Sequence, residues 1–82
     1  MFSKELTRDG HTRTFMVNAL LSSGWEVRVE QDRDVLRETR YFDWHRVERA
    51  LGAIEREVAK LEAQGWQLTA RAVSAAAQST NR

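Results

Sequence analysis

The sequence predicts an α+β fold, a four-stranded antiparallel meander followed by one long C-terminal helix packed on the apolar face of the sheet (ββββα). Three observations predict it. Between residues 44 and 64, apolar residues recur at intervals of three and four, the period of a helix. Upstream, apolar and polar residues alternate, the period of a strand. Short stretches of Gly, Ser and Asp separate these segments where hairpin turns are expected.

The first hairpin is centred on Asp9-Gly10, a pair that strongly favours a two-residue turn. This turn sets Phe2 opposite Val17, and both side chains then face the core. The next connection, residues 22–24, predicts a three-residue loop with Gly24 in the left-handed region. That loop length sets three apolar pairs across the second and third strands: Leu21 with Trp25, Ala19 with Val27, and Val17 with Val29.

Charge decides the register of the fourth strand, residues 35–42. A three-residue loop at residues 32–34 places Arg28 opposite Glu38, whereas a loop shorter by one residue places Arg28 opposite Arg37. Because like charges facing each other destabilise a ladder, the longer loop is favoured. The core side of this strand carries polar residues beside valines, which is typical of an edge strand.

The helix is predicted from Trp44 to Gln64, with Asp43 as its N-cap. Phe42 and Val47 are spaced as a hydrophobic staple. At the other end Gly65 suits a left-handed C′ position, and the next residue is expected to fold back on Leu61. Residues 66–73 begin with alternating apolar and polar residues, and whether they form a further strand stays open.

Length and composition limit the chain to one small domain. The 82 residues, 41% of them hydrophobic, support one modest core, which we assign to residues 1–73. Residues 74–82 are small and polar, so we expect a disordered tail there. The N-terminal segment lacks the apolar stretch of a signal peptide, and the apolar runs are too short to span a membrane. We therefore expect a cytoplasmic protein.

No residue pattern points to catalysis or to a cofactor. His11 and His45 lie in different elements, cysteine is absent, and no spacing supplies a metal site. The serines lack the setting of a nucleophile, and the four glycines have turn or helix positions rather than a phosphate loop. The sequence therefore predicts a protein that is not an enzyme and uses neither metal nor cofactor.

A basic cluster marks the junction of the fourth strand and the helix. It contains Arg37, Arg40, His45, Arg46 and Arg49, and the last four are candidates for contact with an anion or a nucleic acid. Glu38, Asp43 and Glu48 alternate with these residues and weaken the local field. The formal net charge is only +1, which excludes a strongly basic nucleic-acid tail.

Two stretches, Gly24-Trp25-Glu26-Val27 and the run from Asp43 to Ala50, resemble small bacterial proteins of unknown function. The resemblance covers most of residues 13 to 66 and implies a bacterial origin. The element order is also similar to that of the repeats in PUR-type and Whirly-type single-strand-binding proteins, which expose stacking aromatics on the open face of their sheet. Here that face carries mainly charged and polar residues, with Phe42 as its aromatic candidate.

The predicted helix is longer than its sheet is wide. At 1.5 Å per residue it spans about 31 Å, against a four-stranded sheet under roughly 20 Å wide. The overhanging apolar end needs a cover, either the tail from Gln67 or a second copy of the chain. A second copy would use an interface of Ile54, Val58, Leu61 and Trp66, with basic and acidic helix halves set side by side.

We therefore expect a non-catalytic protein-interaction module that forms a homodimer. The alternative is a weak single-stranded nucleic-acid-binding domain. Another protein is a further possible partner, whereas a membrane is not expected.

Overall fold

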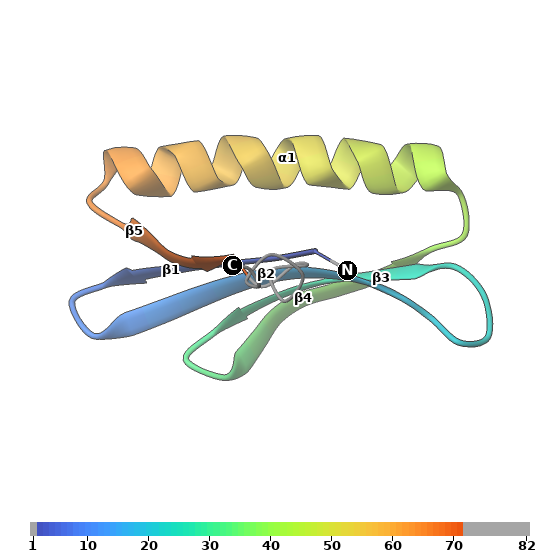
Figure 1. Cartoon of the computed structure of the whole chain (residues 1–82), viewed down its shortest axis with the longest axis horizontal. Coiled ribbons are helices and arrows are strands. Elements are labelled where there is room, and N and C mark those ends of the chain that lie inside the picture. The colour runs from blue at the N-terminus through green and yellow to red at the C-terminus, as the bar shows by residue number, and fades with distance from the viewer. Residues whose placement is uncertain (1, 72–82) are drawn as a thin grey trace, which may run out of the picture.

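A computed structural model describes residues 2–71 of the chain. It confirms the α+β fold: four antiparallel strands form a meander, one helix follows, and a short fifth strand ends the described part. In Figure 1 the helix lies across one face of the sheet, with β4 towards one side and β5 towards the other. The elements are β1 (Phe2–Arg8), β2 (His11–Ala19), β3 (Trp25–Gln31), β4 (Asp34–Tyr41), α1 (Trp44–Ala63) and β5 (Gln67–Arg71). The tail predicted for residues 74–82 lies outside the described residues.

The first hairpin has the predicted register. Asp9 and Gly10 both have positive φ, 53° and 83°, as a two-residue type I′ turn requires. Phe2 consequently faces Val17 across the ladder. Leu6, on the same strand, is fully buried.

The second hairpin corrects the predicted pairing. Val17 faces Val27 rather than Val29, so the two strands are shifted by two residues relative to the prediction. The connection is longer than three residues, and Leu20 N donates to Gly24 O at 2.9 Å across it. The observed register sets Phe15 opposite Val29, and both side chains are buried. The predicted register would have placed the apolar Phe15 opposite the polar Gln31. A shift of two keeps the side chains of the paired residues on their predicted faces. Leu21 is the exception: it was predicted opposite Trp25, but Ala19 takes that place, and Leu21 lies in the connection with its side chain fully exposed.

The third hairpin keeps the predicted pairing but reaches it differently. Arg28 faces Glu38, as the charge argument requires. The turn itself holds two residues, Asp32 and Arg33, with φ of 52° and 77°, and not the predicted three. A bulge in β4 leaves Leu36 without a facing residue in β3, and this one extra residue restores the predicted register from Arg37 onwards.

The turn of this hairpin also holds the start of β2. One carboxylate oxygen of Asp32 accepts from the Thr12 amide at 2.9 Å, and the other lies 2.7 Å from His11 Nδ1. The Thr12 hydrogen bond, followed by that of His11, lowers the pKa of Asp32.

Both predicted helix caps form. The Asp43 carboxylate accepts from His45 N at 2.9 Å, and the helix ends at Ala63, one residue before the predicted end. Gly65 has φ of +99°, and Trp66 N donates to Leu61 O at 3.0 Å, the fold-back of a Schellman motif. Phe42 stays 72% exposed, so the predicted staple buries little of its ring.

The fifth strand covers the overhanging end of the helix. β5 pairs antiparallel with β1, so β1 becomes an interior strand and the sheet order is β4-β3-β2-β1-β5. Trp66, which leads into β5, packs against the core. The tail thus folds back, one of the two covers considered from the sequence. The buried core comprises Leu6, Phe15, Val17, Val27, Val29, Val47, Ile54, Val58 and Leu61.

Candidate interaction surface at strand β4

Strand β4 presents an open edge along its whole length. It is the terminal strand of the sheet, and among residues 2–71 nothing pairs with its outer side. Every residue from Asp34 to Arg40 is exposed, and Tyr41 is partly buried. An edge of unpaired amides and carbonyls this long is a template for another extended chain. The strand was predicted as an edge from its polar core side.

A groove lies between the helix-facing side of β4 and α1. We call it the β4–α1 groove; its volume is about 190 Å³. It exists because the helix turns Ala50 and Ala53 towards this flank, and their single methyl groups are too short to fill the space above the sheet. The groove is lined by Val27, Val29, Arg37, Thr39, Tyr41, Ala50, Ala53, Ile54 and Glu57.

The groove continues past Tyr41 towards the start of the helix. There Arg46 and Arg49 form its border, beside the same two alanines. Its apolar floor therefore has a cationic mouth at one end. Arg46 and Arg49 were candidates for anion contact from the sequence, and the structure places them together at this mouth.

Exposed apolar residues accompany both ends of β4. Val35 and Leu36, next to the bulge, are 49% and 50% exposed. At the other end Phe42 and Trp44 are also exposed, and the Trp44 ring stands edge-on to Trp25 with centroids 5.1 Å apart. Four of the six large apolar residues exposed in the described part thus lie on or beside this strand. Such clustering marks an interaction surface.

The opposite end of the groove is closed by ion pairs. Arg37 Nη2 lies 2.7 Å from one oxygen of Glu57, and Arg13 Nη1 lies 3.7 Å from the other. The Arg13 guanidinium also stacks 5.4 Å from the ring centre of Trp66 and donates to Gln31. These contacts join the sheet, the helix and Trp66, the residue that leads into β5, at one end of the core, which is a structural role.

The open face of the sheet is charged around Arg28. Its Nη2 donates to Glu38 at 2.9 Å, and its Nη1 donates to Glu30 at 3.3 Å. Hydrogen bonding between the carboxyl groups of Glu26 and Glu38 raises the pKa of Glu26 and lowers that of Glu38. The lowered pKa favours the ionised form of Glu38, which lies two residues from Arg40 along β4. Arg40 itself faces Glu26.

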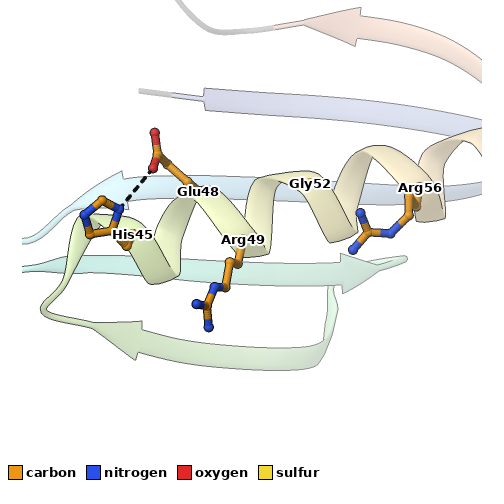
Figure 2. Close-up of a pocket in the computed structure, with 5 residues that line it drawn as sticks. All are labelled: His45, Glu48, Arg49, Gly52 and Arg56. Atoms are coloured by element: carbon orange, nitrogen blue, oxygen red, sulfur yellow. Dashed lines mark ion pairs between the residues drawn. The ribbon is translucent and has the colours of Figure 1, made fainter.

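The remaining candidates for anion contact are separated. Arg40 belongs to the open face of the sheet, because its neighbour Thr39 lies on the groove side. His45 lies on the outer surface of the helix, 3.5 Å from Glu48 Oε1. Figure 2 shows an open depression here, at Gly52, with Arg49 and Arg56 extending to one side and Glu48 to the other. The structure does not gather the predicted basic residues into one patch.

Four residues were expected at a helix-mediated interface: Ile54, Val58, Leu61 and Trp66. The first three are buried in the core of a single chain, and Trp66 is partly buried against that core. The residues that sequence reasoning missed are Ala50, Ala53 and Tyr41. Their signal is weak: two alanines three residues apart on the flank of the apolar helix stripe.

Within residues 2–71, no group of three His, Asp or Glu side chains is close enough to hold a metal ion. The same part of the chain contains no helix with the length and apolarity needed to cross a bilayer. Comparisons of the chain with models of known protein families, with curated proteins and with solved structures found no match.

Proposed function

We propose that this protein is a non-catalytic protein-interaction module that binds an extended segment of a partner chain along β4. The observation that carries the proposal is the coincidence of an open strand edge with an apolar groove beside it. In this mode of recognition the strand edge supplies main-chain hydrogen bonds, and the groove accommodates alternate side chains of the added segment.

The surroundings of β4 support this choice over a purely structural edge. Natural proteins protect edge strands by keeping them short, by placing charges on them, by bulges or by covering them. β4 carries charges of both signs and one bulge, but it is eight residues long, nothing within residues 2–71 covers its outer edge, and it exposes Val35 and Leu36. Its bulge twists only the end nearest the turn, so the stretch from Arg37 to Tyr41 remains regular.

A displayed library of random ten-residue peptides tests the proposal. Selected peptides should shift the amide resonances of β4 and of the groove residues in a ¹H–¹⁵N NMR spectrum. A Thr39→Lys variant should lose this binding, because the charge and length of lysine block both edge and groove. Thr7→Lys, on the interior strand β1, is the matched control and should bind normally. Peptides that bind without shifting β4 resonances, or that bind Thr39→Lys unchanged, contradict the proposal.

The rival function, single-stranded nucleic-acid binding, is tested on the same preparation. Labelled single-stranded DNA and RNA are titrated at low and at high salt. Binding to a phosphate chain weakens steeply with salt, because the cationic groups release counterions. We expect no saturable binding, since Glu26, Glu30 and Glu38 share the open face with Arg28 and Arg40. Saturable and salt-sensitive binding would favour the rival.

A further inference from the structure

We propose that the partner at β4 is a second copy of this chain, which pairs β4 with β4 antiparallel about a two-fold axis at Thr39. This inference rests on the proposed function and names the partner of the same surface. A two-fold axis is the commonest symmetry of protein oligomers, and it requires a surface that complements itself. The charges of β4 meet this requirement in only one of the central registers.

Near the centre of the regular stretch of β4, the two-fold axis can pass through Glu38, Thr39 or Arg40. Each choice sets groove-side residues of one copy opposite groove-side residues of the other. An axis at Glu38 sets the Glu38 carboxylate against its own copy, and an axis at Arg40 sets two guanidinium groups face to face. Both arrangements are destabilised by like charges. An axis at Thr39 instead places Glu38 opposite Arg40 of the second copy, and does so twice. The contact at the axis itself is then a neutral Thr39 pair, which is favourable across strands.

The same register also pairs the other side chains usefully. On the groove side, Arg37 faces Tyr41 of the second copy, an arrangement in which a guanidinium can lie on an aromatic ring. Beyond this regular stretch, the bulged Leu36 of one copy comes near Phe42 of the other, which follows the end of its β4. Both are exposed in the single chain, at 50% and 72%, and would be covered. The apolar residues at the two ends of β4 thus become partners of each other.

Pairing about this axis changes the architecture in a defined way. Two five-stranded sheets join into one continuous sheet, and both helices lie on the same face. The two β4–α1 grooves then meet across the axis, between the helices. The open edges described above disappear, because each β4 supplies the hydrogen-bond partners of the other.

The experiment is a charge exchange read out by molar mass. Light scattering over a range of concentrations should give the parent twice the chain mass of 9.5 kDa. Glu38→Lys sets the new lysine against Arg40 of the copy, and Arg40→Glu sets the new glutamate against Glu38. Each variant alone should dissociate about tenfold more readily or worse, since both pairs change from attraction to repulsion. An equimolar mixture should recover the parent mass as a heterodimer, because every pair is then of opposite charge.

Controls separate this result from general effects of charge or folding. Glu55→Lys and Arg56→Glu make the same reversals at exposed helix positions and should leave the parent mass unchanged. Each reversal also sets like charges against each other within one chain, because Glu38 faces Arg28 and Arg40 faces Glu26. Circular dichroism melting therefore verifies that each variant still folds. Failure of the mixture to associate, or dissociation of the controls as well, overturns the register.

The outcome also distinguishes this inference from the proposed function. A parent that stays at 9.5 kDa at every concentration, yet binds selected peptides at β4, overturns the homodimer and leaves the interaction module standing. A dimer insensitive to Thr39→Lys and to both reversals overturns the inference by placing the contact elsewhere.

Discussion

Replacing Ile54 with alanine tests whether the apolar helix stripe serves the core or an interface. Ile54 is 3% exposed and packs towards the sheet. The substitution removes three buried carbons, worth about 0.8 kcal/mol each in transfer, and leaves a cavity. Because Ile54 also lines the β4–α1 groove, part of that space is open to water. We expect a loss of about 3 kcal/mol, which lowers the melting temperature of a domain this small by roughly 12–24 °C.

The matched control is Leu51→Ala, three residues away on the same helix. It deletes the same number of carbons from a side chain that is only partly buried. Its expected cost is about half as large. Both variants are melted by circular dichroism at a low and a high protein concentration. Equal losses for the two variants, or an Ile54 effect that appears only at high concentration, would refute the assignment of Ile54 to the core of one chain.

Three further predictions concern backbone and charge. Gly24→Ala should cost at least about 2 kcal/mol in thermal unfolding, because a Cβ there lies 2.5 Å from Tyr41 O at φ +86°; Gly10→Ala, with open space around it, should cost less. Gly52→Ala should raise the free energy of unfolding by about 0.5–1 kcal/mol in urea titration, because the added Cβ makes only an ordinary contact with Arg56. A lower free energy of unfolding would contradict the helix environment described for Gly52. Asp32→Asn should lower the melting temperature at pH 7. The difference should begin to shrink as the pH falls towards 3.8, the ordinary pKa of the carboxyl group. It should vanish only below the lowered pKa of folded Asp32, because the carboxyl group is then protonated in both the folded and the unfolded chain; a difference that persists in strong acid would exclude the Asp32 charge as its cause.

Local rules predicted those parts of the fold that depend on neighbours in the sequence. The helix and its caps follow from Asp43, Gly65 and the apolar period between them. The pairing of Arg28 with Glu38 follows from charge alone. The turn could not be settled by that argument, because a three-residue loop and a two-residue turn with a bulge at Leu36 produce the same facing pairs.

Other parts of the fold depend on how far one segment is shifted or placed relative to another, which the alternation of apolar and polar residues does not determine. A two-residue slip between β2 and β3 leaves both faces intact, so alternation cannot distinguish Val17–Val27 from Val17–Val29. The docking of β5 on β1 joins residues sixty or more positions apart in the sequence. The groove was missed for a similar reason: it depends on where the helix lies above the sheet, and Ala50 and Ala53 do not specify that position in isolation.

The pairing of β1 with β5 has a consequence for the order in which the protein is made. A ribosome releases the chain from the N-terminus, so β1 to β4 emerge long before Gln67–Arg71. Until then the edge of β1 that β5 will occupy is free, and Leu6, Phe15 and the rest of the apolar face await the helix. The nascent domain therefore passes through a stage with two open edges at opposite sides of its sheet, and β5 later closes the edge at β1. Premature termination just after Trp66 would leave a product fixed at that stage, with β1 as well as β4 open to strand addition.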